Sequence, residues 1–372
     1  MPHAPDVATT LERCGTRTDI LHRVVREAFP QLRAAAEDAG RSLPGYVERA
    51  VARYLSCGDP AGGFAWLVCE ACDHHRLVPF SCKTRAICPS CGGRRMASRA
   101  AWLVDHVIPA VPVRQWVLTV PWSRRFLLAR RPDLVRGVLA QALDVLFRWY
   151  AERARAPREA RCGAVTFVQR FGSALNLNVH FHVLVPDGGW IRAPSGALAF
   201  RSVQGPTTED VEDLVVRIAD ACERYLDRRG FGEGEGDDDP DSDDAQTLLQ
   251  QASLAGVAAL GGRAGRMARR LQVHAGHAFP LPPHCAGCDG YNLHAGVRVR
   301  AFDRQGLERL CRYVSRPPLG RARLEEQDDG SLLLHLKTPW ADGTTALHLA
   351  PLELVERLVA LIPPSRKNEV LP

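Results

Sequence analysis

The sequence of 372 residues lacks any apolar run long enough to form a membrane-spanning helix. Its first residues also lack the basic and apolar regions of a secretory signal peptide. These two absences argue against membrane and secreted proteins, so we expect a cytoplasmic protein. Lysine is scarce as well, since only Lys83, Lys337 and Lys367 stand among the 48 basic residues. A GC-rich genome would produce the same bias, and the scarcity therefore excludes no class of function.

Cysteine is abundant by contrast, with 12 residues in the chain. A reducing cytosol does not favour structural disulfides, so these cysteines need another explanation. Cys69-x-x-Cys72 and Cys88-x-x-Cys91 have the spacing of a structural four-cysteine zinc site, which is our prediction. Substitute ligands, or members of a second ion site, are Cys57, Cys82, His74 and His75. A further pair, Cys285-x-x-Cys288, has no partner pair and is interpreted as structural.

Positive charge is concentrated in one segment. The net charge of the chain is +6, whereas residues 76–131 contain eleven basic residues against the single acid Asp105. Dense charge of one sign beside a small metal module is typical of a nucleic-acid binder. We therefore expect DNA contacts in this segment, at Arg85, Arg94, Arg95 and Arg99 among others.

The segment Leu177–Val185, with the sequence LNVHFHVLV, has the alternation of a half-buried strand. Side chains alternate between the two faces of a strand, so one face is apolar and the other carries His180 and His182. Neutral imidazole is the commonest ligand for transition metals, and a pair on a rigid strand leaves coordination positions open. This pattern also occurs without function, as two histidines on a solvated strand.

Tyr313 stands at the edge of the apolar stripe of a predicted helix over 305–315. Arg309 and Arg316 lie about one helical turn away on either side. Cationic neighbours favour the phenolate form of a tyrosine and bind anions, which suits a nucleophile for phosphoryl chemistry. On its own, such a residue is more often a structural tyrosine at the border of a helix.

The remaining pattern has helices and strands in mixed order, which favours an α+β fold. Alternation predicts strands over 115–120, 164–170, 178–185, 295–302, 331–337 and 344–349, with a turn back at 187–189. Helical periodicity predicts helices over 20–55 with a break at Pro44-Gly45, and over 96–107, 134–150, 211–229, 245–271 and 352–361. The glycine- and acid-rich segment 230–245 is expected to be a disordered surface insertion.

Four blocks, in order, resemble the HUH rolling-circle transposases of the insertion-sequence-ninety-one type and their common-region relatives. They are CEAC (69–72) with SCKTRAICPSC (81–91), FGSALNLNVHFH (171–182), LHAGV (293–297), and LERLCRY (307–313) with RPPL (316–319). The resemblance covers roughly residues 57–363. It implies an HUH endonuclease-like antiparallel sheet domain with flanking helices (106–352), behind a helical, zinc-binding DNA-recognition head (1–105) and before a C-terminal helix and tail (353–372).

The resemblance also implies a mechanism. His180 and His182 would hold Mg²⁺ or Mn²⁺, and Tyr313 would attack the scissile phosphate to leave a 5′-phosphotyrosine and a free 3′-hydroxyl. Many relatives have a second tyrosine four residues earlier, where this chain has Arg309, so it resembles a single-tyrosine branch. Transfer of both strands would then need a second subunit or sequential use of Tyr313. The family pattern also continues past a segment like 362–364, which suggests a shortened C-terminus.

Two imidazoles alone hold a hard cation poorly, so a third ligand is expected, with Gln169 and His294 as candidates. Cys82 is a further candidate for the structural zinc. The partners implied are single-stranded DNA at transposon ends and target DNA, with a homodimer on DNA and association with the bacterial nucleoid. Expected DNA contacts outside the basic segment are Arg309, Arg316 and Lys337.

Three other functions use parts of the same pattern. A plasmid replication initiator or relaxase shares the histidine pair and the tyrosine, but the zinc head and the LHAGV block favour a transposase. A decayed transposase would be a zinc DNA-binding protein without catalysis, which a test for a covalent DNA adduct distinguishes. A cupin-like metal oxidase also uses His-x-His, yet neither the basic segment nor the cysteine pairs serve that chemistry.

Overall fold

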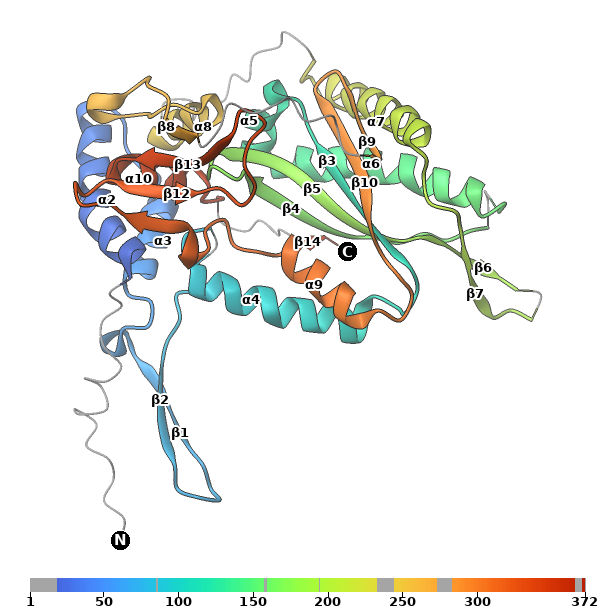
Figure 1. Ribbon diagram of the computed structural model, residues 1–372, viewed down its shortest axis with the longest axis horizontal. Coiled ribbons are helices and arrows are strands. Elements are labelled where there is room, and N and C mark those ends of the chain that lie inside the picture. The colour runs from blue at the N-terminus through green and yellow to red at the C-terminus, as the bar shows by residue number, and fades with distance from the viewer. Residues whose placement is uncertain are drawn as a thin grey trace.

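The computed structural model describes residues 19–84, 86–156, 159–193, 195–232, 244–272, 283–364 and 370–371. Within these residues the chain combines helices with antiparallel sheets, which confirms the predicted α+β class (Figure 1). None of the helices described is long and apolar enough to cross a membrane. Most of the predicted acidic insertion, together with Arg85, lies outside the described residues.

A six-stranded sheet forms the centre of the molecule, with the strand order β14-β4-β5-β3-β10-β9 and every neighbouring pair antiparallel. The histidine-bearing strand β5 lies between β4 and β3 and is therefore hydrogen-bonded along both edges. The strands are β3 (Val113–Thr119), β4 (Val165–Phe171), β5 (Leu177–Pro186), β9 (Cys285–Cys288), β10 (Tyr291–Val299) and β14 (Val370–Leu371).

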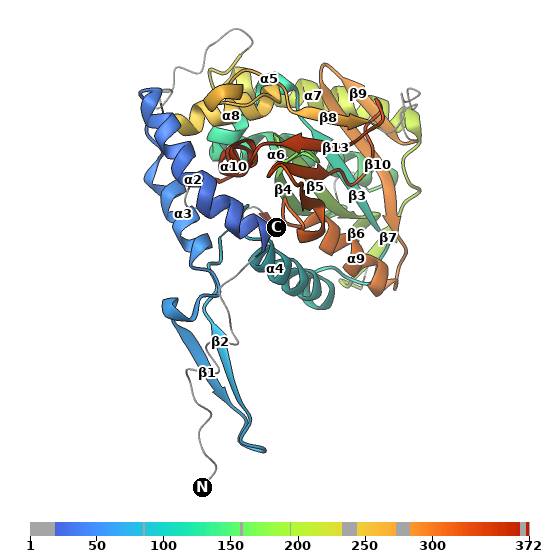
Figure 2. The same ribbon diagram turned by 60° about the vertical axis from the view of Figure 1, so that its left-hand side comes forward.

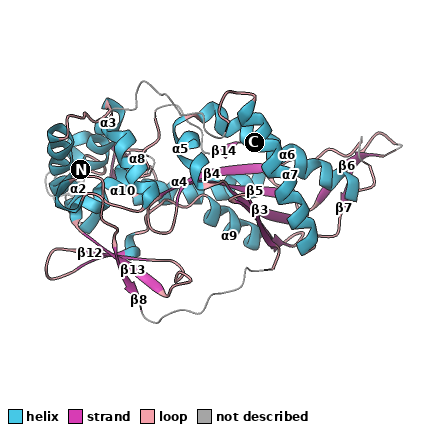
Figure 3. Ribbon diagram, turned by 90° about the horizontal axis from the view of Figure 1, so that it is seen from above, coloured by secondary structure: helices cyan, strands magenta, loops and turns pink. Residues whose placement is uncertain are grey.

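Helices cover both faces of this sheet (Figure 3). On one face, the apolar side of β5 packs in a large core with α6 (Pro132–Arg153) and α7 (Thr208–Asp227). On the face that carries the histidines, a smaller core joins Phe167 and Leu184 to α9 (Arg304–Val314). The helix α9 is strongly amphipathic, and its buried residues are Leu307, Leu310, Cys311 and Val314.

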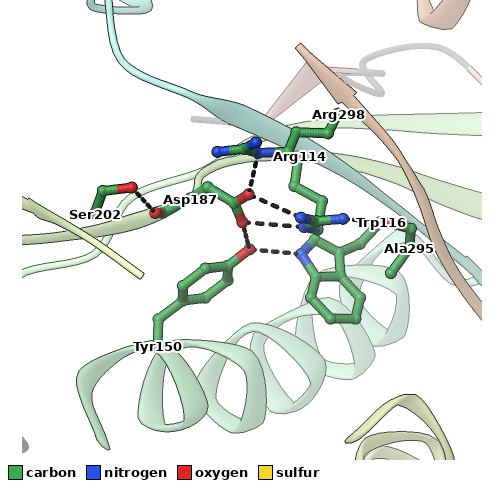
Figure 4. Close-up of polar contacts among 7 residues, drawn as sticks. All are labelled: Arg114, Trp116, Tyr150, Asp187, Ser202, Ala295 and Arg298. Carbon is green, nitrogen blue, oxygen red and sulfur yellow. Dashed lines mark hydrogen bonds and ion pairs between the residues drawn. The ribbon is translucent and has the colours of Figure 1, made fainter. Parts of the chain in front are cut away.

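Asp187, the residue after β5, anchors the sheet to its neighbours (Figure 4). Its carboxylate is fully buried and accepts hydrogen bonds from Arg114 on β3, at 3.0 and 2.9 Å, and from Arg298 on β10, at 2.9 Å. The hydroxyl of Tyr150 on α6 donates to the same carboxylate at 3.0 Å and accepts from the Trp116 indole at 3.1 Å. One charge therefore ties two strands and a helix to the end of β5.

The predicted turn back at 187–189 is wrong. After Asp187 the chain enters β6 (Gly188–Arg192), which pairs with β7 (Leu198–Ser202) in a separate two-stranded ribbon. The reason is that β4 and β3 already occupy both edges of β5. Gly188 is needed here, because a Cβ at this position would lie 2.2 Å from the carbonyl oxygen of Arg201.

The N-terminal part contains α2 (Ile20–Asp38), α3 (Gly45–Leu55), the hairpin β1 (Phe64–Val68) and β2 (His75–Pro79), and α4 (Pro89–Trp102), followed by a π-helical turn (Leu103–Val107). Figure 2 shows the hairpin projecting away from the body of the molecule. The helix α2 packs against the last helix, α10 (Pro351–Ala360), so the first and last helices of the described chain are neighbours. The helix α4 packs against α9.

A second, four-stranded sheet has the order β11-β12-β13-β8. The helix predicted over 245–271 is shorter than expected: α8 (Ala245–Ala255) ends where Gly256 adopts a left-handed conformation with φ +75°. The other elements are α5 (Trp122–Arg130), β8 (Arg269–Gln272), β11 (Leu324–Glu326), β12 (Leu332–His335), β13 (Thr344–Leu349) and 3₁₀ turns at Pro60–Gly62, Gly261–Arg263 and Arg321–Arg323.

Candidate active site and zinc site

His180 and His182 lie side by side on the α9-facing side of β5. Their ring centroids are 5.0 Å apart, and the two residues are only 8% and 3% exposed. The period-two geometry of the strand places both on this face, while Val179, Phe181 and Val183 enter the opposite core. The pair is thus held rigidly at the boundary between the sheet and α9.

The environment keeps both imidazoles neutral. Burial lowers the pKa of His180 to about 4, and the positive charges of Arg316 and Arg125 act in the same direction. Burial, followed by the neighbouring His180 and by Arg316, lowers the pKa of His182 to about 2. Neutral imidazole is the form that ligates metals, so the pair is ready to bind a cation at neutral pH.

Hydrogen bonds orient the two rings. The Nδ1 of His180 lies 3.0 Å from the carbonyl oxygen of Asn178, which requires a proton on Nδ1 and leaves the lone pair on Nε2. The Nδ1 of His182 lies 2.6 Å from the side-chain amide nitrogen of Gln115 on β3. Turning this amide by about 180° brings its oxygen to Nδ1, where it accepts the ring proton and leaves the lone pair on Nε2. Among the described residues, the buried Nε2 of His182 has no hydrogen-bond partner. In that tautomer Nε2 fits a metal ligand, because metal-binding histidines usually donate a hydrogen bond through the other ring nitrogen.

Gln169 and His294, the two candidates for a third ligand, differ in position. Gln169 on β4 is the register partner of His180, and its Nε2 donates to the carbonyl of Val314 at 2.7 Å. The remaining oxygen, Oε1, is buried without a partner in the part of the chain that is described. His294 on β10 and His182 on β5 both pair with Val117 of β3, so β3 lies between them. Two strand spacings put the backbone of His294 about 10 Å from that of His182. The geometry therefore favours Gln169 over His294.

Tyr313 extends from α9 over the histidine pair. Its ring centroid is 6.0 Å from that of His182, and the two rings are nearly perpendicular at 87°. The side chain is 46% exposed, so a substrate has access to it. The guanidinium of Arg316 lies 4.4 Å and the ammonium of Lys337 lies 4.9 Å from the centre of the phenol ring.

Positive charge converges on this tyrosine. Burial lowers the pKa of Arg316, and burial together with Arg316 and Arg323 lowers the pKa of Lys337 to about 8. No carboxylate among the described residues forms an ion pair with Arg316, Arg323 or Lys337. Such a cluster repels itself and would be stabilised by an anion, as a phosphodiester bound beside Tyr313 would be.

A four-cysteine cluster is built by the N-terminal part from Cys57, Cys82, Cys88 and Cys91, whose sulfur atoms all lie within 4.8 Å of one another. The Sγ atom of Cys57 lies 3.8 Å from that of Cys88 and 3.6 Å from that of Cys91. The Sγ atom of Cys82 lies 3.5 Å from that of Cys91. Tetrahedral Zn²⁺ with bonds of about 2.3 Å requires sulfur separations of about 3.8 Å. The cluster therefore fits one structural zinc ion.

This ligand set corrects the prediction from spacing. Cys88 and Cys91, from the first turn of α4, belong to the cluster, and so does Cys82, but Cys57 takes part in place of the pair Cys69 and Cys72. Both members of that pair are exposed at the far end of the β1–β2 hairpin. Five residues of strand carry them roughly 17 Å from the base of the hairpin, where the cluster lies.

The arginine face of α4, which we define as Arg94, Arg95 and Arg99, connects the zinc cluster to the tyrosine region. Arg95 and Arg99 line a cavity of about 70 Å³ together with Gln169 and Arg316. Arg94 is exposed at the helix surface, and Arg309 is exposed on α9, one turn before Tyr313. Of the basic residues predicted from two distant segments, Arg95 and Arg99 are thus brought together with Arg316 in one cavity.

Sequence reasoning missed Gln115 and Arg323. Gln115 had a signal, since it is a polar residue on the same face of its strand as Thr119, which pairs with His180. Arg323 had none, because the packing of a loop against Ser173, His335 and Pro318 positions it.

Two family descriptions match the chain. The family described as a putative transposase matches residues 163–370, and the transposase zinc-binding domain matches residues 24–120. The first match contains the histidine pair and Tyr313, and the second contains the cysteine cluster. No curated protein and no solved structure matches the chain. Because the first match alone spans more than half of the sequence, the chain belongs to the transposase family of the insertion-sequence-ninety-one type, with its zinc-binding domain at the N-terminal end.

Proposed function

We propose that this transposase cuts and rejoins single-stranded DNA through a 5′-phosphotyrosine intermediate, in the rolling-circle manner of HUH enzymes. The observation that supports it most is the position of the Tyr313 ring, 6.0 Å from His182 and flanked by two cations. The substrates are single-stranded DNA at the ends of the element and in the target. An HUH-type arrangement of the central sheet is part of the same proposal.

Tyr313 is the nucleophile. Its Oη forms a bond to the scissile phosphorus, the bond from phosphorus to the 3′ oxygen breaks, and the leaving strand takes up a proton as a free 3′-hydroxyl. The phenolic proton passes to solvent. Arg316 and Lys337 stabilise the negative charge that develops on the phosphate and the phenolic oxygen. Attack by a 3′-hydroxyl on the phosphotyrosine reverses these bonds and rejoins the DNA.

A divalent cation completes this site. The Nε2 atoms of His180 and His182 and the Oε1 of Gln169 are the ligands we propose, since two of these atoms are buried without a partner. The oxygen matters because Mg²⁺ and Mn²⁺ prefer oxygen ligands. When bound, the cation would polarise the scissile phosphate.

One tyrosine limits each subunit to one covalent linkage at a time. Arg309 occupies the exposed position one turn before Tyr313, where a two-tyrosine enzyme has its other nucleophile. We therefore propose that both strands are transferred by a homodimer on DNA or by sequential use of Tyr313. Arg309 would then contact a phosphate.

The zinc-binding domain would position the DNA. A closed four-cysteine site leaves no coordination position for chemistry, so the zinc ion stabilises the first turn of α4. The later turns of the same helix carry the arginine face of α4, and Arg95 and Arg99 line one cavity with Arg316, which lies three residues after Tyr313. Nucleoid association would follow from this charge.

The test is a covalent adduct between the protein and a labelled single-stranded oligonucleotide, detected on a denaturing gel in Mn²⁺. We expect an adduct with the wild type and none with Tyr313→Phe, while binding to DNA stays nearly unchanged because a single oxygen is lost. Tyr225→Phe on α7 is the matched control and should retain the adduct.

An adduct formed by Tyr313→Phe would assign the nucleophile to another residue. A wild-type protein that binds the oligonucleotide but never forms an adduct would be a binding protein, and the enzyme proposal would be wrong.

A further inference from the structure

An apolar groove separate from the histidine pair lies between α5 and α8. Its volume is about 610 Å³, and its walls include Trp122 and Phe126 from α5, Leu254 from the end of α8 and Val257 just after that helix. Trp122 is 60% exposed, which is unusual for so large an apolar side chain. Its indole nitrogen donates to the carbonyl of Leu254 at 3.4 Å, and this contact holds the ring at the wall of the groove.

The α5 wall of the groove begins close to the proposed active site. Thr119, at the end of β3, is the register partner of His180, and α5 begins three residues later at Trp122. Three residues of chain span at most about 10 Å. Arg125 lies on the same face of α5 as Trp122 and Phe126, and its charge acts on His180. A strand of DNA that leaves the histidine pair therefore reaches the groove within a few nucleotides.

Basic residues adjoin the lining of the groove in the chain. Gly265 lines the groove, and the next residue, Arg266, is exposed; Arg269 is exposed on the strand that follows. Neither arginine has an ion-pair partner among the residues that the structure describes. Arg125 is half-buried, and its Nε donates to the carbonyl of Val120. A nucleotide would contact both the apolar walls, through its base, and the neighbouring cations, through its phosphates. An apolar protein segment would contact only the walls.

We propose that this groove holds an unpaired nucleobase of the single-stranded DNA substrate, stacked on Trp122, with the adjoining phosphates contacted by Arg125 and Arg266. This inference rests on the proposed function, because the DNA strand in the groove is the same strand that Tyr313 would cut. Proteins that bind single strands combine aromatic platforms for the bases with positive charge along the backbone, and this groove has both. Stacking tolerates any base, so the groove would supply affinity and register rather than sequence specificity.

The experiment measures binding of a fluorescein-labelled oligothymidylate by anisotropy, with Tyr313→Phe as the parent so that no chemistry intervenes. Adding Trp122→Ala should weaken binding roughly 5- to 150-fold, the range for loss of one base–aromatic stack. Trp122→Phe should recover most of the affinity. Leu198→Ala on β7 is the matched control, since this apolar side chain is equally exposed (61%) and lies on the separate ribbon.

A second probe separates the base from the backbone. An abasic oligomer of the same length should bind the parent more weakly, and Trp122→Ala should weaken it no further. Unchanged binding of oligothymidylate by Trp122→Ala, or equal weakening of both probes, would overturn the proposal. Because this assay needs no adduct, its result is independent of whether Tyr313 proves to be the nucleophile.

Discussion

Replacing Asp187 by alanine tests how strongly one buried charge holds the central sheet. The carboxylate is 0% exposed and Arg114 is 7% exposed, so removing the acid leaves the guanidinium as an uncompensated charge in the core. Breaking one partner of a buried ion pair costs about 3–5 kcal/mol. Losing the ion pair with Arg298 adds little to this cost, because the Arg298 side chain is 43% exposed and its charge is solvated by water. We expect Asp187→Ala to lower the free energy of unfolding by about 3–5 kcal/mol.

Urea denaturation followed by circular dichroism measures this loss. With an m value of about 3 kcal/mol/M, the midpoint should fall by about 1 to 1.7 M. The matched control is Asp213→Ala, which removes an exposed pair with Arg217 and should cost less than about 0.5 kcal/mol. Adding Arg114→Met to an Asp187→Leu variant should recover most of the stability, because an apolar pair needs no desolvated charge. A loss under about 1 kcal/mol for Asp187→Ala would refute this account of the network.

Three further predictions concern zinc, pH and salt. Cys57→Ser should abolish stoichiometric zinc measured by elemental analysis, whereas Cys69→Ser should retain the ion of the four-cysteine cluster; the reverse result would restore the ligand set predicted from spacing. The metal-free protein should lose stability as the pH falls below about 6.5, by up to about 1.4 kcal/mol per pH unit for each of His180 and His182. Stability falls rather than rises because the pKa values of His180 and His182 in the folded protein, about 4 and about 2, lie below the unfolded value of 6.5. Below pH 6.5 the unfolded chain therefore binds more protons than the folded one. Urea midpoints at pH 7.5 and 5.5 measure the loss, and a double substitution of the histidines by asparagine should flatten it. Replacing the arginine face of α4 by glutamine should reduce the dependence of DNA affinity on salt, at roughly 0.7 in slope for each lost phosphate contact on a single strand, and an unchanged slope would place the DNA elsewhere.

The sequence alone determined those features that depend on local geometry. The period of two in a strand was sufficient to put His180 and His182 on one face, and the helical period was sufficient to leave Tyr313 beside a buried stripe. Mixed helical and alternating patterns were sufficient to predict the α+β class. The family resemblance then linked the histidines to the tyrosine, although 130 residues separate His182 from Tyr313 in the chain.

Only the tertiary structure decided which distant residues meet. Spacing favoured Cys69 and Cys72 as zinc ligands, but a projecting hairpin removes them and brings Cys57 to the cluster. Register between strands, which no local pattern specifies, placed Gln169 rather than His294 next to His180. The groove beside Trp122 likewise exists only because α5 packs against α8. The physical reason is common to all three: local periodicity sets the direction of a side chain, whereas its neighbours depend on how the buried faces of separate elements pack together.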